Sequence, residues 1–273
     1  MKRIFVLLVL ITTLMSGCER DEFDIPSNKI YYTTTDGNTI SIYPFCFNMD
    51  MDGYDVKIIS NTYKKGKGII VFDKEIKNIG EMAFSAAPTL KTITIPPSVT
   101  SVDNSAFSGC SSLQAFYGKG ASSDNRCLIF NKRLTNFASA GIDSYTIPQG
   151  VTSIDGAFRE CEKLKDIIIP EGVTWIGSLS FIKCESLTSI TLPSTLKQID
   201  GGMIFEGCTS LRDIHVKAVI PPILDEDWPN FIGDRNMFYG YDAYGVIYVP
   251  RGSVEAYKRA WRYYDNNIEP MDY

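Results

Sequence analysis

Cysteine is the residue type in this sequence with the most obvious capacity for chemistry, as a nucleophile, a metal ligand or a disulfide partner. Seven cysteines occur in 273 residues, and four of them lie three positions after a phenylalanine. Aligned copies of this pattern carry at that position Ala87, Cys110, Ser139, Cys161, Cys184 and Cys208. Because alanine and serine replace cysteine in two copies, we interpret the position as one that requires a small side chain rather than a thiol.

The spacing of these cysteines argues against a metal site. A zinc ion holds its sulfur ligands at about 2.3 Å. Neighbouring strands lie ~4.8 Å apart, which would place Cys161 and Cys208, two repeats apart, roughly 10 Å from each other. We therefore predict no metal and no cofactor. A disulfide between adjacent repeats satisfies the distance that the bond needs and stays open as an alternative.

The only histidine, His215, is the obvious candidate for acid or base catalysis near neutral pH. It occupies an outward position of a predicted strand, and Asp213 lies two residues before it on the same face. Covalent catalysis needs a nucleophile within reach of a base, and the sequence pattern pairs no such residue with His215. We therefore predict that the protein is not an enzyme.

Composition excludes a further class of partner. The chain is 44% hydrophobic and 22% charged, as is ordinary for a globular protein with a sizeable core. Its formal net charge of −5 provides no basic surface, so we predict no nucleic-acid partner.

A repeat of about 23 residues positions the cysteines. Its phenylalanine anchors are Phe84, Phe107, Phe158, Phe181 and Phe205, and the long interval before Phe158 holds another copy around Tyr145 and Ile147. A leucine follows at offset six, and apolar residues at offsets nine and eleven show the period of a strand. A second extended piece, such as 173–176, closes each unit. The phenylalanine and the small residue have the spacing of one helical turn.

A unit of this length cannot bury its apolar side alone and must stack on its neighbours. We therefore predict an α/β repeat solenoid with short parallel strands and one hydrophobic column for each inward position. The column at offset eleven reads Ile95, Gly118, Ile147, Ile169, Leu192 and Val216.

Three segments depart from the repeat. Residues 117–139 contain two apolar runs around a turn, which predicts an inserted β-hairpin. The C-terminal cap, 217–273, contains a predicted helix with one apolar face, formed by Val254, Tyr257, Trp261 and Tyr264. We assign residues 29–78 to an N-terminal β cap and 79–273 to the solenoid with its hairpin and C-terminal cap.

The N-terminus, "MKRIFVLLVLITTLMSGC", has a basic start, an apolar run too short to cross a bilayer, and small residues before Cys18. It predicts an export signal over 1–17 and a lipid on Cys18 that contacts the membrane; an ordinary secretory signal is the alternative. Charged residues and Pro26 predict a tether over 18–28. The acidic stretch resembles the surface signal of lipoproteins in Bacteroides-type bacteria, which implies an outer-membrane lipoprotein exposed on the cell.

The repeats resemble the BspA-like leucine-rich repeat family. The family pattern of Ala-Phe, Cys three later, Leu three after that, then Ile-x-Ile-Pro and Val-Thr-x-Ile matches residues 79–216. The ending "IYVPRGSVEAYKRAWRYYDNNIEP" is also similar to that of such proteins in Bacteroides-type bacteria. The resemblance implies cell-surface adhesion or recognition of host or matrix proteins.

The outward strand positions form the predicted binding surface, an extended ribbon that suits contact with an extracellular or host protein or glycan. Our candidate binding residues are Tyr117, Ile168, His215, Thr94 and Thr191. A structural spacer or an envelope assembly component without a specific ligand is the alternative, and an enzyme is a more distant one.

Overall fold

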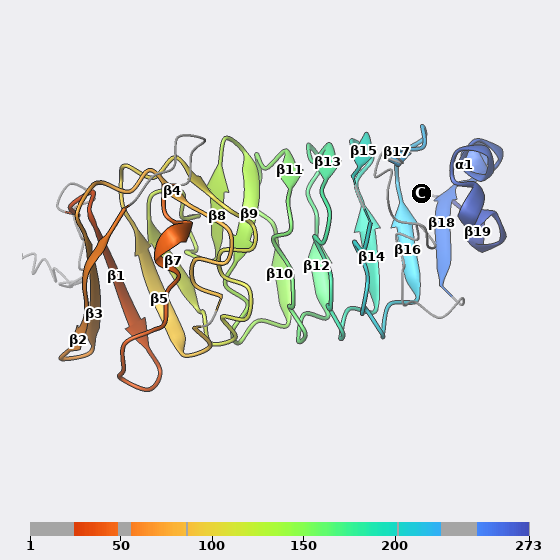
Figure 1. The fold of residues 1–273 in the computed structure, drawn as a ribbon. Helices are drawn as coiled ribbons and strands as arrows, with labels where there is room; N and C mark the ends of the chain where they lie inside the picture. The colour runs from red at the N-terminus through yellow and green to blue at the C-terminus, as the bar shows by residue number, and fades with distance from the viewer. Residues whose placement is uncertain (1–24, 49–55, 86, 201, 225–244, 273) are drawn as a thin grey trace, which may run out of the picture.

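The computed structural model describes residues 25–48, 56–85, 87–200, 202–224 and 245–272. These residues wind into a β-solenoid whose turns follow one another from β2 at one end to α1 at the other (Figure 1). Each repeat between β10 and β17 contributes one strand to each of two sheets, and the strands of successive repeats pair in parallel. The predicted leucine-rich repeat solenoid is confirmed.

The first strands of the C-terminal repeats form a six-stranded parallel sheet. Its order is β10 (Ser144–Thr146), β12 (Asp166–Ile168), β14 (Ser189–Leu192), β16 (Asp213–Val216), β18 (Val246–Pro250) and β19 (Ile268–Met271). Equivalent repeat positions pair, as Ser189 does with Asp213 and Leu192 with Val216. Each side chain therefore lies beside its counterpart in the next repeat.

The second strands form another six-stranded sheet, which contains the hairpin. Its order is β17 (Ile223–Leu224), β15 (Gln198–Ile199), β13 (Trp175–Ile176), β11 (Ser153–Ile154), β9 (Arg133–Phe137) and β8 (Cys127–Phe130). Only β8 and β9 pair antiparallel in this sheet, which confirms the predicted hairpin. Its turn residues Asn131 and Lys132 have φ of 50° and 65°, as a tight hairpin turn requires.

A separate sheet forms the N-terminal part. Its order is β2 (Ile58–Lys64), β3 (Lys67–Phe72), β1 (Lys29–Thr34), β5 (Leu90–Ile95) and β7 (Ala115–Gly118). The pairs up to β1–β5 are antiparallel, and β5–β7 is parallel. The remaining elements here are the two-stranded sheet of β4 (Asn78–Ile79) and β6 (Ser101–Val102), and the 3-10 helix η2 (Pro44–Cys46).

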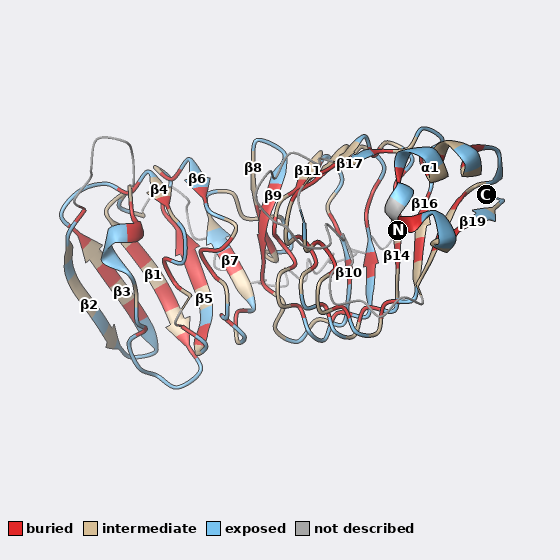
Figure 2. Cartoon of the chain, turned by 45° about the vertical axis from the view of Figure 1, so that its right-hand side comes forward, coloured by how far each residue is buried: buried red, intermediate tan, exposed pale blue. Residues whose placement is uncertain are grey.

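The inward columns read from the sequence are buried in the solenoid, where Figure 2 shows buried residues alternating with exposed ones along the strands. Ile95, Ile147, Leu192 and Val216 are fully buried. The small residue at offset three closes a hydrogen-bonded turn rather than a helix: the Cys184 N–H donates to the Phe181 carbonyl at 3.2 Å, for example.

Two hydrophobic cores lie on either side of the hairpin. Cys127 and Leu134 of the hairpin belong to the C-terminal core, whereas Leu128 and Ala138 belong to the N-terminal core. Successive side chains of a strand point to opposite faces, so the hairpin presents one face to each core. It acts as a partition in the solenoid.

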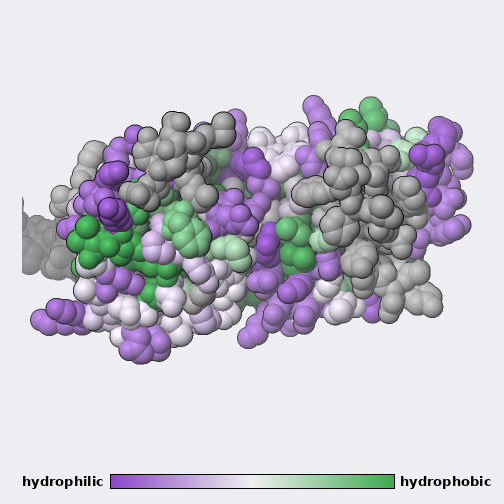
Figure 3. All heavy atoms as spheres, viewed as in Figure 1, coloured by the Kyte–Doolittle hydropathy of each residue, from purple (hydrophilic) through white to green (hydrophobic). Residues whose placement is uncertain are grey.

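The C-terminal end is covered by α1 (Val254–Ala260), which follows the 3-10 helix η3 (Arg251–Ser253) and precedes η4 (Arg262–Asn267). The aromatic face of this cap is buried as predicted. The helix itself is shorter than predicted, because Trp261 leaves helical conformation with φ −111° and ψ 55°. Strand β19, which pairs with β18, was not predicted. Figure 3 shows a hydrophilic surface at this end, whereas hydrophobic side chains gather at the opposite end.

The export signal, Cys18 and most of the predicted tether lie outside the described residues. The end of the tether segment already belongs to the fold, since the Ile76 N–H donates to the Ser27 carbonyl and the Phe72 N–H to the Asn28 carbonyl, both at 2.9 Å. Within the described ranges, every helix is too short or too polar to cross a membrane.

Candidate binding surfaces

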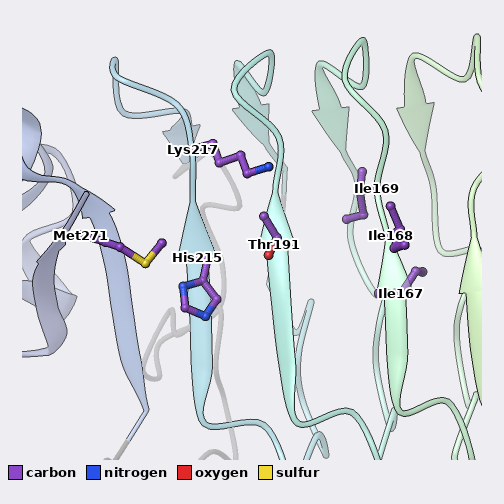
Figure 4. Close-up of a pocket in the computed structure, with 7 residues that line it drawn as sticks. All are labelled: Ile167, Ile168, Ile169, Thr191, His215, Lys217 and Met271. Carbon is purple, nitrogen blue, oxygen red and sulfur yellow. The ribbon is translucent and has the colours of Figure 1, made fainter. Parts of the chain in front are cut away.

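The outward face of the parallel sheet brings three predicted binding residues into one row. Ile168 on β12 pairs with Thr191 on β14, and Thr191 pairs with His215 on β16. Because paired residues of a sheet share a face, their side chains project side by side (Figure 4). Parallel register alone assembles this row.

A shallow hollow of about 440 Å³ lies on this row. Ile168, which is 61% exposed, forms one side, and Met271 from β19 extends towards His215 on the other (Figure 4). Lys217 supplies a cation at the rim. The hollow therefore offers apolar contact, one charge and one imidazole to a ligand.

The ring of His215 is held by β18 rather than by an acid. It stacks on Tyr248 with ring centroids 4.9 Å apart and an interplanar angle of 11°. Its Nδ1 is buried and has no hydrogen-bond partner among the described residues. No described hydrogen bond joins Asp213 to this imidazole. The sequence did not identify Tyr248, although the register of the last repeat brings it opposite His215.

The other two candidates lie elsewhere, and the prediction of one continuous ribbon is wrong. Tyr117, on β7, belongs to the N-terminal sheet and not to the sheet of Ile168. Thr94 is only 9% exposed, because β1 adds to β5 and places Tyr31 beside it, with Tyr117 on the other side. The sequence did not reveal this pairing, since β1 lies outside the repeat.

The column cysteines are buried and form no disulfides, and three of their thiols donate hydrogen bonds to backbone carbonyls. The Sγ atoms of Cys110, Cys184 and Cys208 donate to the carbonyls of Phe84, Phe158 and Phe181 at 3.2, 3.2 and 3.0 Å. The interpretation by volume alone is therefore incomplete: the position favours a small side chain with a donor, which the serine of the other copy also supplies.

Burial also makes these thiols poor nucleophiles. It raises the pKa of Cys110 and of Cys161 from 9.0 to about 12, so both stay protonated at neutral pH. Reactive cysteines have lowered pKa values and an electropositive, accessible setting. The column thus supports a structural role for its thiols.

A second concave site, not predicted from the sequence, lies at the break between the two cores. This pocket of about 540 Å³ is lined by turns 109–114, 139–142 and 159–164 of three successive repeats. One feature of the sequence could have pointed to this pocket: in the middle copy, Asn136 replaces the phenylalanine of the anchor position. Its side chain instead donates to the Asp103 carbonyl at 3.1 Å.

Comparison with known proteins identifies the repeat. The family model described as "BspA type Leucine rich repeat region" matches six copies over residues 57–125 and 133–225, more than half of the chain. The match begins inside the segment assigned to the N-terminal cap. No match was found among the curated proteins.

Several solved structures are similar to the chain. A leucine-rich cell surface protein from Faecalibacterium prausnitzii A2-165 is 23% identical, with 54% of this chain and 53% of that chain covered and a TM-score of 0.39. A leucine-rich repeat protein from Eubacterium ventriosum is 22% identical, with 62% and 47% covered and a TM-score of 0.44. One from Bacteroides ovatus is 22% identical, with 85% and 66% covered and a TM-score of 0.38. The chain spans about half the length of the first two.

Proposed function

This chain belongs to the BspA-type leucine-rich repeat family, and from that premise we propose that it is a lipid-anchored cell-surface protein that binds an extracellular protein or glycan. The outward face of β12, β14 and β16 is the binding surface. The single observation that carries the proposal is the exposed row of Ile168, Thr191 and His215 beside a hollow.

The exposure of Ile168 supports a binding role for this row. A large aliphatic side chain that is 61% exposed on a strand leaves most of its apolar surface in water, and the same position carries threonine in the repeats on either side. The residues on either side of it in the chain, Ile167 and Ile169, point inward, are each 7% exposed and belong to the C-terminal core. The row therefore rests on a rigid support, which reduces the entropy lost on binding.

A binding screen tests this proposal. The mature chain, residues 18–273 with Cys18→Ala to prevent lipid attachment, is presented to matrix proteins and to a glycan array. We expect a specific partner whose affinity falls at least tenfold in Ile168→Ser, because the apolar contact at the centre of the row is lost.

The chain offers a matched control in Ile223, which is 67% exposed on β17 of the other sheet. Ile223→Ser removes the same apolar surface and should leave the affinity unchanged. Equal losses in both variants would contradict the assignment of the surface. A screen without any partner would favour the spacer or assembly role instead.

The membrane anchor is tested separately in cells. The basic start, the apolar run and the small residues before Cys18 support lipid attachment at that thiol. We expect the full-length chain to incorporate a labelled fatty acid and Cys18→Ala to lose the label entirely. Cys46→Ala, which replaces a buried cysteine of the fold, should keep it. Labelling of Cys18→Ala at the level of the parent would contradict the anchor.

A further inference from the structure

The pocket at the break between the two cores is recessed because its middle turn is built of small residues. Ala140 and Gly141 occupy the positions where the next repeat has Glu162 and Lys163. All of these line the pocket, together with the turn of the preceding repeat. The volume of about 540 Å³ lies within the range of small-molecule sites.

The pocket reaches the phenylalanine column of the solenoid. Phe107 and Phe137, which flank the break and line the pocket, are each 8% exposed. The anchors Phe84, Phe158, Phe181 and Phe205 are 0 to 1% exposed. Phe107 packs on Phe84 and Phe116, each at 5.1 Å, and Phe137 packs on Phe158 at 4.9 Å. Among the described residues no ring contact joins Phe107 to Phe137, because Asn136 holds the anchor position between them. An apolar group of a ligand can take the place of the missing ring.

Arg159 adds a free cation to this apolar floor. Its side chain lines the pocket, and its Nε is buried without a hydrogen-bond partner among the described residues. Glu160 does not satisfy it: one carboxylate oxygen accepts the Gly109 N–H at 3.1 Å and the other lies 3.7 Å from Lys183 Nζ. A buried N–H without a partner is costly, so the site favours a ligand that brings an acceptor.

We propose that this pocket binds a small amphipathic carboxylate whose apolar or aromatic group enters between Phe107 and Phe137 and whose carboxylate pairs with Arg159. A guanidinium matches a carboxylate in shape and charge and binds it through parallel hydrogen bonds. The charges around the pocket also favour an anion. Lys183 neutralises Glu160, and the remaining charged side chains are two cations, Arg159 and Lys163, and one anion, Glu162. The site is separate from the row of Ile168 and does not depend on it.

The test compares 3-phenylpropionate with its neutral isostere 3-phenylpropionamide by calorimetry and NMR on the mature chain, residues 18–273 with Cys18→Ala. We expect the acid to bind at least tenfold more tightly than the amide, because only the acid forms charge-assisted bonds with Arg159. Acetate, which lacks the apolar group, should bind at least tenfold more weakly than the acid.

Three variants in the pocket and one control variant outside it locate the site. Arg159→Gln should abolish the preference for the acid, and Arg159→Lys should restore part of it. Arg259→Gln removes an exposed arginine of α1 and serves as the charge-matched control, with the parent's affinities expected. Ala140→Phe should fill the recess and block both compounds, so the proposal stays testable even where Arg159→Gln unfolds.

A peptide ending in phenylalanine, N-acetyl-Gly-Gly-Phe, distinguishes two sources of the carboxylate. Tighter binding than 3-phenylpropionate would support a peptide C-terminus as the ligand, and weaker binding would support a free acid. Equal affinity of the acid and the amide for the parent chain, or no binding of either, would overturn the proposal. Neither result would affect the test of Ile168.

Discussion

At the residue scale, the thiol column shows how a repeat selects a side chain. The phenylalanine carbonyl of each turn accepts an N–H from its own turn, as Phe158 does from Cys161 at 3.3 Å. It then accepts a thiol from the next repeat, that of Cys184. A carbonyl has two lone pairs, so both bonds satisfy it fully. Cys161 itself follows the copy without an anchor, and its Sγ lies 3.9 Å from the Arg159 carbonyl and interacts with the Ser139 side chain instead of a phenylalanine carbonyl.

The buried thiols predict a loss of stability at alkaline pH. Burial raises the pKa of Cys110, Cys127 and Cys161 from 9.0 to about 12. The unfolded chain therefore releases these protons near pH 9 while the folded chain keeps them. The stability that the protonated thiols contribute is complete below pH 9 and is lost as the pH rises towards 12. Each thiol contributes a slope of about 1.4 kcal/mol per pH unit.

Urea unfolding between pH 8 and 10 measures this slope, because ionisation of the tyrosines dominates the change in stability only at higher pH. We expect the unfolding free energy to fall increasingly steeply above pH 9. The fall of the unfolding free energy with pH should be less steep in Cys161→Ala, because one of the contributing thiols is absent. A stability that stays level up to pH 10 would show that these thiols titrate alike in both states.

At the scale of the elements, the sequence predicts strands well where the repeat continues and poorly where it ends. Ile169 could be assigned to the core because Ile147 and Leu192 recur at the same offset in the neighbouring copies. Strand β1 has no repeat partner, so its antiparallel addition to β5 and the burial of Thr94 could not be foreseen. The end of α1 was missed because the aromatic spacing continues through η4, where 3-10 geometry still buries Tyr264.

The same distinction holds for the candidate binding surfaces: one could be predicted from the repeat and the other could not. The row of Ile168, Thr191 and His215 follows from strand register, which the repeat length specifies. The pocket beside Arg159 arises where one copy lacks its phenylalanine anchor. The shape of this pocket depends on how the neighbouring turns pack around Asn136. Periodicity describes the average unit and carries little information about such a defect.

We expect the stability of the strands next to the C-terminal cap to depend on two of its aromatic residues. Trp261 is buried and its Nε1–H donates to the Pro222 carbonyl at 2.9 Å, while the Tyr257 hydroxyl donates to the Ala218 carbonyl at 2.7 Å. We expect Trp261→Ala to destabilise the cap by about 3–5 kcal/mol. Tyr257→Phe, which removes the hydroxyl and its hydrogen bond to the Ala218 carbonyl, should cost about 1–2 kcal/mol.

Hydrogen exchange of β18 measures both effects, since α1 packs on this strand. Glu255→Ala changes an exposed residue of the same helix and should leave the exchange of β18 unchanged. If Trp261→Ala exchanged like the parent in β18, the cap would contribute nothing to the strands beneath it.

At the scale of the whole molecule, the hairpin divides one solenoid into two hydrophobic cores. The N-terminal core is closed by antiparallel strands, and the C-terminal core by α1 and β19. Between them the column of stacked rings is interrupted, with Phe84 and Phe107 on one side and Phe158, Phe181 and Phe205 on the other. The stability of a solenoid depends on contacts between neighbouring repeats, so the weakest coupling is expected at this interruption.

Two matched truncations test whether the halves unfold separately. Phe84 and Phe181 are both fully buried and both stack on the next ring, so Phe84→Ala and Phe181→Ala should each cost about 3–5 kcal/mol. Because coupling across the hairpin is weak, Phe84→Ala should accelerate hydrogen exchange in β5 and β7 and leave β14 and β16 protected. Phe181→Ala should do the reverse. If each truncation exposed both sheets equally, the chain would unfold as one cooperative unit, and the hairpin would join the cores rather than separate them.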